Sequence, residues 1–275
     1  MDARAGGSIM GHIIVFQNNK GGVGKSTASA ATAHALAMLG HRVLLVDADS
    51  QANATELLLP PKAEMNVSLY HLLRDHTPVE EVIQASKYPD LDLLPNQEIT
   101  AGLEPSIMAA EAEKPGSQRY QQLRQRLRPY AKDTYDYTII DTPPNLGTFV
   151  LLALNCADFV VVPVQADGSF SLKGLKNAVN TIEGLRASTN PDLRFLRLLV
   201  NMKDNRTSLG KAIPDKLKQS FSAEHVFSTE IRISTLFHKA EALGKTILGY
   251  DSHCRPAKDF LDVADELVSQ LNQNE

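Results

Sequence analysis

The chain has no tryptophan, and its only two cysteines, Cys156 and Cys254, lie far apart in the sequence. Such a pair forms neither a disulfide framework nor a clustered metal site. It fits a reducing compartment, so we expect a cytoplasmic protein. No apolar run approaches the ~18 residues that are needed to cross a bilayer. Residues 1–11 are small and polar, without the basic segment and apolar core of a signal peptide, and we expect them to be disordered.

An excess of positive charge is also missing. The 275 residues include 28 Lys and Arg against 32 Asp and Glu, which gives a net charge of −4. Because no basic field surrounds the whole protein, any nucleic-acid binding must come from a local patch. The apolar fraction of 43% supports a full core, and the length is ordinary for one α/β domain. We expect this domain to span residues 12–272.

Short apolar runs alternate with helical patterns along most of the chain. The runs predict buried strands at about 12–18, 42–46, 91–94, 137–140, 159–164 and 194–200. The stretches between them predict helices at about 28–39, 66–85, 120–130, 171–187, 207–220 and 257–271. This alternation indicates an α/β fold with a doubly wound, mostly parallel sheet flanked by helices. Pro105, Pro115 and Gly116 interrupt residues 96–118, which we interpret as a surface excursion.

The first predicted strand leads into a glycine-rich loop, residues 17–27, and then directly into a helix. The glycines permit a tight turn whose N–H groups point at an anion, and the helix N-terminus adds partial positive charge. Lys25 can reach the β- and γ-phosphates of a nucleotide, and the Ser26 hydroxyl can ligate Mg²⁺. We therefore predict a P-loop whose nucleotide-binding residues are Lys20, Gly21, Gly22, Val23, Gly24, Lys25, Ser26 and Thr27.

This loop departs from the common P-loop pattern, because Asn19 stands where the first glycine would fall and Lys20 directly precedes Gly21. The sequence Asn-Lys-Gly-Gly-Val-Gly-Lys-Ser resembles the deviant Walker A loop of the ParA/MinD superfamily, and the later motifs resemble its ParA/Soj-type partition ATPases. The resemblance implies that Lys20 is a catalytic lysine that crosses a dimer interface. The alternative is a solvated surface lysine.

Acidic residues follow two other predicted strands. The stretch from Asp47 to Thr55, Asp-Ala-Asp-Ser-Gln-Ala-Asn-Ala-Thr, resembles a ParA segment in which proline is usual at the position of Ser50. The resemblance implies that Asp49 orients the attacking water and that Asp47 supports the Mg²⁺ shell. The alternative is that both acids merely end a strand and cap a helix.

Asp141 follows the strand at 137–140 and opens the sequence Asp-Thr-Pro-Pro. A buried strand that ends in an aspartate after a P-loop is the Walker B pattern, so Asp141 would hold Mg²⁺ through water. The sequence is also close to the ParA/MinD version of this motif, in which Pro143 and Pro144 would stiffen a loop that senses the γ-phosphate. The predicted metal set is therefore Ser26, Asp47 and Asp141, and the predicted catalytic set is Lys20, Lys25 and Asp49.

Polar and basic residues of the C-terminal half supply further candidates. Asn201, at a strand end, is our adenine candidate, although such an amide can also satisfy only local backbone. The Asp-Asn-Arg-Thr segment around Arg206 resembles one in chromosomal ParA proteins whose arginine is implicated in non-specific DNA binding. Each basic residue is alternatively a solvated charge, as are the arginines of the 120–130 helix. The DNA-binding candidates are Arg206, Lys211, Arg232, Lys239 and Lys245.

The resemblance implies an Mg²⁺-dependent ATPase that forms a homodimer with ATP and binds DNA non-specifically in that state, associated with the nucleoid. A ParB-like or cargo-adaptor protein would stimulate hydrolysis, and the cargo would be a plasmid, a chromosome or a protein cluster. The main alternative is a MinD-like membrane- or protein-positioning ATPase. The acidic helix at 257–271 argues against a membrane anchor. A metallocluster carrier would need paired cysteines, and a tyrosine autokinase would need a tyrosine-rich tail.

Overall fold

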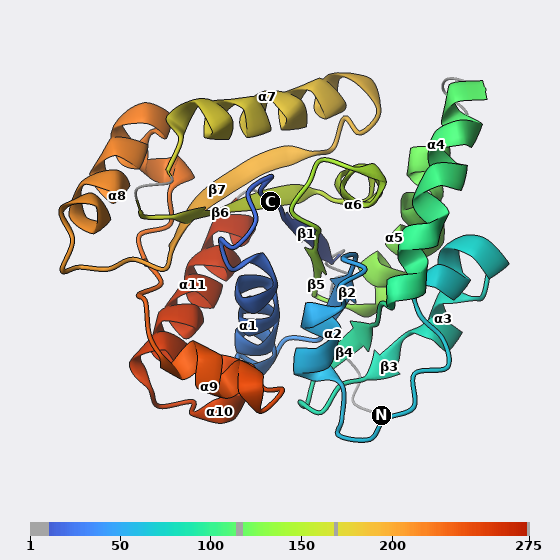
Figure 1. The fold of residues 1–275 in the computed structure, drawn as a ribbon, viewed down its shortest axis with the longest axis horizontal. Coiled ribbons are helices and arrows are strands. Elements are labelled where there is room, and N and C mark those ends of the chain that lie inside the picture. Colours follow the sequence, from blue (N-terminus) through green and yellow to red (C-terminus); the bar gives the residue numbers. More distant parts are fainter. Residues whose placement is uncertain (1–10, 114–117, 168–169, 274–275) are drawn as a thin grey trace.

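The computed structural model describes residues 11–113, 118–167 and 170–273, and its centre is a sheet with strand order β3-β4-β2-β5-β1-β6-β7 (Figure 1). The strands are β1 (His12–Phe16), β2 (Val43–Asp47), β3 (Gln84–Ala85), β4 (Leu91–Leu94), β5 (Tyr137–Asp141), β6 (Phe159–Gln165) and β7 (Arg194–Asn201). Every pairing is parallel except β3 with β4. The predicted doubly wound, mostly parallel fold is confirmed.

Helices cover both faces of this sheet. They are α1 (Lys25–Met38), α2 (Asn53–Leu58), α3 (Val79–Val82), α4 (Glu104–Glu113), α5 (Gln122–Thr134), α6 (Thr148–Cys156), α7 (Leu172–Ser188), α8 (Ser208–Phe221), α9 (Leu236–Ala242), α10 (Ile247–Tyr250) and α11 (Arg255–Asn272). One layer contains α1, α2 and α9–α11, and the other contains α3–α8. Figure 1 shows α1 and α11 lying side by side, with β6 and β7 above them in this view.

Side chains of β1 alternate between the two cores, as strand geometry requires. Ile13 and Val15 belong to the cluster beneath α5 and α6, whereas Ile14 and Phe16 belong to the cluster beneath α1 and α11. All four side chains are essentially inaccessible to solvent. A central strand buried on both faces explains why its sequence is continuously apolar rather than alternating.

The prediction of one continuous helix at 66–85 is wrong, because the helical conformation is interrupted and confined to residues 69–75 and 79–82. The structure has a π-helical turn at His71–Asp75, the single turn of α3, and the edge strand β3. His76 ends the π-helical turn in the left-handed conformation, and Pro78 precedes α3. The apolar positions that imitate a helix, such as Leu72 and Val82, are buried, but two short elements bury them instead of one helix.

The predicted surface excursion at 96–118 also needs correction, because α4 occupies residues 104–113 after a 3-10 turn at Glu98–Leu103. Pro105 lies in the first turn of α4, where a proline's missing N–H group breaks no helical hydrogen bond. Leu103 and Ile107 pack into the core. Residues 114–117, which include Pro115 and Gly116, lie outside the described residues.

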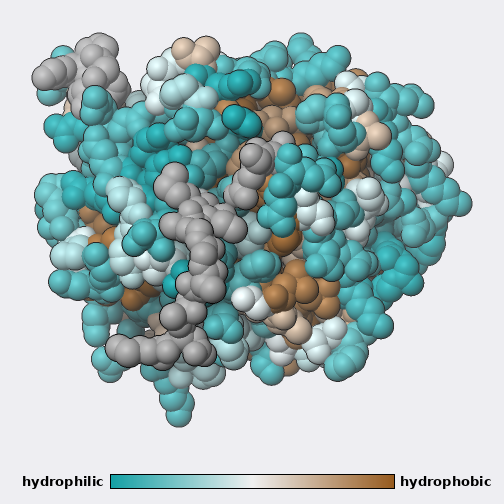
Figure 2. Space-filling view, turned by 180° about the vertical axis from the view of Figure 1, so that it is seen from behind, coloured by the Kyte–Doolittle hydropathy of each residue, from teal (hydrophilic) through white to brown (hydrophobic). Residues whose placement is uncertain are grey.

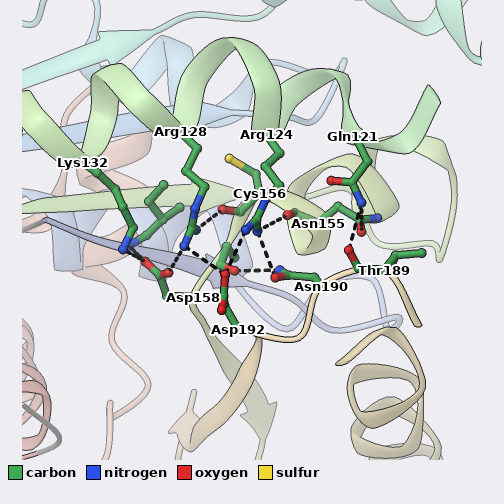
Figure 3. A network of polar contacts seen from close by, with 12 residues as sticks. Gln121, Arg124, Arg128, Lys132, Asn155, Cys156, Asp158, Thr189, Asn190 and Asp192 are labelled. Carbon is green, nitrogen blue, oxygen red and sulfur yellow. Dashed lines mark hydrogen bonds and ion pairs between the residues drawn. The ribbon is translucent and has the colours of Figure 1, made fainter. Parts of the chain in front are cut away.

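The charged helix predicted at 120–130 corresponds to α5, but two of its arginines, Arg124 and Arg128, form ion pairs within the protein instead of a solvated face. Figure 3 shows Arg124 and Arg128 pointing from α5 toward the segments that precede β6 and β7. Arg128 pairs with Asp158 at 2.5 Å, and Arg124 pairs with Asp192 at 2.9 Å. Arg124 also donates to the Asn155 carbonyl at 3.1 Å. These contacts attach α5 to the sheet edge at which β6 and β7 begin.

The predicted amphipathic helix at 257–271 corresponds to α11, and its apolar face packs against α1 and the sheet. No helix in the described part of the chain is long and apolar enough to cross a membrane. Figure 2 shows one face on which hydrophilic residues predominate and hydrophobic ones form separate patches. The predicted disorder of residues 1–11 falls outside the described residues except at Gly11, whose N–H donates to the Lys132 carbonyl at 2.9 Å.

Candidate nucleotide and magnesium site

The glycine loop lies between β1 and α1, at the edge where the parallel strands end. Gly22 and Gly24 adopt positive φ angles of 74° and 72°, a conformation that favours glycine. A Cβ atom on Gly24 would lie 2.7 Å from the Asn201 Nδ2 atom, so the backbone approach here also requires glycine. Gly24 is the N-cap of α1 and offers no side chain to cap that helix. The first N–H groups of α1 are therefore oriented for an anion.

A cavity of about 460 Å³ opens at this loop. Its volume falls within the range of small-molecule sites in proteins. The lining residues come from the loop, from the segment after β2, from the loop after β5 and from α9. They are Gly21, Gly22, Gly24, Lys25, Ser26, Thr27, Asp49, Gln51, Asn53, Glu56, Leu57, Pro144 and Glu241.

The two lysines of the loop have different surroundings. Lys25 is 7% exposed, and its Nζ atom donates to the Lys20 carbonyl at 3.2 Å. Burial lowers the pKa of Lys25, while the nearby Asp141 and Asp49 act in the opposite direction. The Lys20 side chain is 38% exposed and lies 3.8 Å from Asp167, which follows β6. Lys25 thus faces the cavity, and Lys20 extends along the surface beside it.

Asp47 is completely buried, and three hydrogen bonds satisfy its carboxylate. Oδ1 accepts from the Asp49 N–H at 3.0 Å, and Oδ2 accepts from the N–H and hydroxyl of Thr55, each at 2.8 Å. Burial raises the pKa of Asp47, and these hydrogen bonds lower it. The carboxylate therefore holds the start of α2 against the end of β2, which favours the structural alternative weighed for this residue.

Asp141 is equally buried, but neither of its carboxylate oxygens accepts a hydrogen bond within bonding distance. Burial raises the pKa of Asp141, and the negative charge of Asp47 raises it further; the hydroxyls of Ser26 and Ser29 act in the opposite direction. An unsatisfied buried carboxylate is costly unless a cation compensates it. Its proximity to the Ser26 hydroxyl therefore fits the predicted Mg²⁺ site.

Among the described residues, no cluster of three or more His, Cys, Asp or Glu side chains surrounds a common metal position. This result is compatible with magnesium, which binds few carboxylates and takes its other ligands from water and nucleotide phosphates. A hydroxyl from Ser26 and the carboxylate of Asp141 match that chemistry. The residues present thus fit a nucleotide-bound Mg²⁺ ion rather than a metal held by protein alone.

Asp49 lines the cavity directly and is 7% exposed. Its Oδ1 atom accepts from the Gln51 N–H at 3.0 Å, which fixes the carboxylate at the turn after β2. The Asp49 carboxylate borders the space that Lys25 faces. This placement brings two of the predicted catalytic residues to one cavity.

Residues of the cavity that the sequence analysis did not identify include Glu56, on α2, and Glu241, on α9. Glu241 accepts a hydrogen bond from the Thr27 hydroxyl at 2.7 Å, although 214 positions separate the two residues. Only tertiary structure brings α9 to the phosphate loop, so no local pattern could have indicated Glu241. Gln51 and Asn53 lie in the segment that the resemblance already highlighted.

Asn201 holds the phosphate loop rather than lining the cavity. Its Nδ2 atom donates to the Val23 carbonyl at 2.8 Å, and its Oδ1 atom accepts from the Met202 N–H at 3.0 Å. The side chain is only 4% exposed. The structure therefore favours the alternative interpretation, in which this amide satisfies backbone groups, and contact with adenine stays a prediction.

The five DNA-binding candidates have unequal surroundings. Arg206 is 85% exposed but pairs with Asp204, and its hydrogen bonds lower the pKa of that carboxyl to about 2. Arg232 pairs at 2.6 Å with Asp259, which is 2% exposed. This buried ion pair gives Arg232 a structural role that needs no DNA. The remaining candidates are exposed and lie on α8, on α9 and after α9: Lys211, Lys239 and Lys245.

A larger cavity, of about 620 Å³, lies between α5 and the end of α7, beside the network of Figure 3. It contains none of the loop glycines or acidic residues of the nucleotide site. Cys156 is completely buried near it, and burial raises the pKa of its thiol to about 12. Burial keeps this thiol in its neutral form, which is the weaker nucleophile.

A glycine loop between strand and helix, a buried lysine and a Walker B aspartate define a P-loop nucleotide-binding protein. Comparison with known proteins places the chain more narrowly. A family model described as an AAA domain matches residues 11–195. The sporulation initiation inhibitor protein Soj of Bacillus subtilis is 37% identical over 260 residues, which are 94% of this chain and 99% of the relative.

The chromosome partitioning protein ParA of Caulobacter vibrioides is 32% identical over 94% of each chain. The chain therefore belongs to the ParA/Soj family of partition ATPases. Its fold is similar to cobyrinic acid a,c-diamide synthase of Mycobacterium smegmatis, solved with ADP and magnesium, with a TM-score of 0.80, 26% identity and 97% coverage of each chain. The cell division ATPase MinD of Pyrococcus furiosus shares the fold, with a TM-score of 0.76, 22% identity and coverage of 94% and 99%.

Proposed function

We propose that this ATPase is a nucleotide-controlled partition switch, which binds Mg²⁺–ATP, dimerises, and then binds DNA non-specifically while it segregates or positions a cargo. The observation that carries the proposal is the convergence of the glycine loop, Lys25 and Asp49 on one cavity. The buried carboxylate of Asp141 does not line this cavity, but it is close enough to Lys25 and Ser26 to interact with both. The full-length similarity to Soj and ParA supports the partitioning role.

Hydrolysis by this site would rest on positioning and charge. Lys25 would exchange its bond to the Lys20 carbonyl for the β- and γ-phosphates of ATP, and Asp49 would orient the attacking water. Bound Mg²⁺ would neutralise charge on the phosphates. Asp141 would orient water ligands around the ion, and Ser26 would coordinate it directly.

Dimerisation would complete the site through Lys20. Its side chain lies at the rim of the loop and can exchange its weak contact with Asp167 for the nucleotide of a second protomer. A cation supplied in this way acts on transition-state charge, and removing one from comparable enzymes costs ~10³-fold or more in rate. A ParB-like or cargo-adaptor protein would accelerate this step and so release the protein from DNA and the nucleoid.

Binding to an arbitrary DNA duplex in the presence of ATP, ADP or no nucleotide tests the proposal. Asp49→Ala is used to hold the ATP state. We expect binding only with ATP, retention of that binding in Asp49→Ala, and loss of it in Lys20→Ala. Size-exclusion chromatography of the same proteins should show a dimer only in those nucleotide states and variants that bind DNA.

The contrary result is ATP hydrolysis without DNA binding in any nucleotide state. It would exclude the DNA-binding switch and favour a MinD-like positioning ATPase, which pelleting with liposomes and ATP would then examine. DNA binding that persists in Lys20→Ala would instead remove the proposed link between dimerisation and DNA.

A further inference from the structure

The loop that joins β5 to α6 carries Pro144 into the nucleotide cavity and is anchored at both ends. At its start, the Thr142 hydroxyl donates to the Phe16 carbonyl at 2.8 Å, which fixes the loop to the end of β1. Pro144 lines the cavity and lies beside Gly21, since a Cβ atom on that glycine would be 3.8 Å from the Pro144 Cβ atom. The position of Pro144 therefore depends on where the far end of the loop is held.

Glu104 holds that far end from another element. Its Oε1 atom accepts from the Thr148 N–H at 2.9 Å, which caps α6 from the first turn of α4. The residue before α6, Gly147, provides no side-chain cap, so Glu104 supplies the acceptor that the helix N-terminus lacks.

A side chain on Gly147 would displace the Glu104 carboxylate from its present position. A Cβ atom there would lie 2.7 Å from the Glu104 Oε1 atom. Glycine at 147 thus allows the carboxylate to approach the backbone closely. The two residues form one anchor, and this anchor joins a segment remote in sequence to the end of the Walker B loop.

Glu104 also shares a cavity with the predicted catalytic aspartate. This cavity has a volume of about 250 Å³ and is lined by both Asp49 and Glu104. Pro144 lines it as well as the larger nucleotide cavity, so the two spaces meet at this proline. The anchor therefore borders the space in which Asp49 would hold the attacking water.

We propose that Glu104 is a positioning residue for ATP hydrolysis, which acts by holding the loop 142–147 and thereby Pro144 against the phosphate loop. This inference rests on the proposed ATPase reaction. Glu104 contributes its acceptor oxygen rather than its charge, because its observed bond is to a backbone N–H group. A loop released at one end misplaces the groups around the reacting phosphate without removing any group that binds the nucleotide.

Steady-state ATP hydrolysis by the full chain tests this role in Glu104→Ala and Glu104→Gln. We expect Glu104→Ala to lower kcat by roughly tenfold to a hundredfold, as small misplacements at reacting centres do, while KM stays within about threefold. Glu104→Gln keeps an oxygen that can accept from Thr148, so it should retain most of kcat. Glu113→Ala removes an exposed acid from the same helix and serves as the matched control.

Binding of a fluorescent ATP analogue and thermal unfolding of each variant separate positioning from folding. A Glu104→Ala protein with full nucleotide binding and low kcat supports the inference. Unchanged kcat in that variant overturns it, as does an equal loss in Glu104→Gln, because charge would then be the cause. A loss of kcat that parallels lost nucleotide binding also overturns it. Absence of hydrolysis in the wild-type protein would overturn the proposed function as well, which distinguishes the two failures.

Discussion

Asp47 and Asp141 show how two buried carboxylates on neighbouring strands can have different tasks. Both are inaccessible to solvent and lie directly opposite each other in the parallel pairing of β2 with β5. Asp47 accepts three hydrogen bonds from the protein, whereas the oxygens of Asp141 accept none. Because burying an unpaired charge is costly, Asp141 is the carboxylate that gains most from a nearby cation.

Gly24 and Gly22 allow a matched test of the phosphate loop, because both have φ angles near +70° but different neighbours. Gly24→Ala would place its Cβ atom against Asn201 and Met202, whereas Gly22→Ala meets nothing within 4 Å. We expect Gly22→Ala to cost about 1–2 kcal/mol of stability from backbone strain alone. Gly24→Ala should cost clearly more, because the Asn201 amide must also move.

Urea unfolding of the two variants measures this difference in the free energy of unfolding. Equal destabilisation by the two substitutions would show that the close approach of Asn201 to the loop is not required. Asn201→Ala in the wild-type background serves as the control for loss of the amide alone.

His34 predicts a pH dependence of stability. It is 6% exposed, its ring stacks on Tyr88 at 3.9 Å, and its Nδ1 atom lies 2.7 Å from the Thr246 hydroxyl. Burial lowers the pKa of His34 to about 4. The unfolded chain, with a histidine pKa near ~6.5, therefore binds the proton more readily. The neutral ring of His34 therefore contributes to the free energy of unfolding. This contribution is fully present above pH ~6.5, and roughly 3 kcal/mol of it is lost as the pH falls toward 4.

Urea unfolding at several pH values between 7 and 4 measures how the free energy of unfolding changes with pH, which gives a slope for each protein. His34→Gln should flatten it in that window, whereas His253→Gln, at an exposed position, should leave it unchanged. An identical slope in the wild-type and His34→Gln proteins would contradict the assignment.

At the scale of elements, the sequence predicted those segments whose burial is decided locally. The strands β1, β2, β5 and β6 are continuous apolar runs, because helices cover both sides of them, and their positions are confirmed. The prediction of one helix at 66–85 failed because Leu72 and Val82 show helical spacing, although two separate short elements bury them. The helix α4 was missed because Pro105 was counted as a breaker, although it lies in the first turn.

The residues of the candidate site also fall into those that local sequence predicts and those that only the fold brings together. The glycine loop and Asp141 are contiguous motifs, so the sequence alone could identify them. Glu241 and Glu104 reach the site from α9 and α4, and only the fold brings them there. The network around α5 was equally invisible, because a run of arginines in sequence does not show which carboxylates lie opposite it.

That network predicts where α5 is most sensitive. Asp158 is 7% exposed; it pairs with Arg128 and with Lys132, and its Oδ2 atom accepts from the Ile13 N–H at 2.9 Å. Asp158→Asn removes the counter-charge of two partly buried cations: Lys132 loses its carboxylate partner, and Arg128 keeps only the more distant Asp192, at 3.7 Å. We expect a loss of about 3–5 kcal/mol in the free energy of unfolding, the usual result of breaking a buried pair.

Chemical denaturation of Asp158→Asn measures this loss, and Arg186→Ala is its control. Arg186 forms an exposed pair with Glu183 at 3.6 Å, which should contribute less than about 1 kcal/mol. A similar small effect for both variants would mean that the α5 network does not stabilise the fold.

At the scale of the whole molecule, the two edges of the sheet have separate tasks. The nucleotide cavity lies where β1, β2 and β5 end, whereas the α5 network lies where β6 and β7 begin. Ligands of doubly wound folds bind at the former edge because the connecting loops diverge there. The opposite edge is free to be stabilised by charge pairs, so Asp158→Asn should weaken folding while leaving nucleotide affinity in the folded protein unchanged.

The net charge of −4 makes the salt dependence of DNA binding the most informative property of the whole molecule. A protein with no overall basic field can hold DNA only through a local cluster of phosphate contacts, and each of these contacts releases counterions. In the ATP state, the logarithm of the association constant should therefore fall steeply and linearly with the logarithm of salt concentration. A flat response would exclude binding through phosphate contacts.

The same titration can identify the contacts. Lys211→Ala, Lys239→Ala and Lys245→Ala should each reduce the slope by about two, because a dimer loses one contact from each protomer. Arg186→Ala, on α7, should leave the slope unchanged. Arg232→Ala should lower stability instead, because it leaves Asp259 buried at 2% exposure with only the more distant Arg255, at 3.8 Å, to compensate it. A reduced slope with unchanged stability in Arg232→Ala would reverse this assignment and return that arginine to the DNA surface.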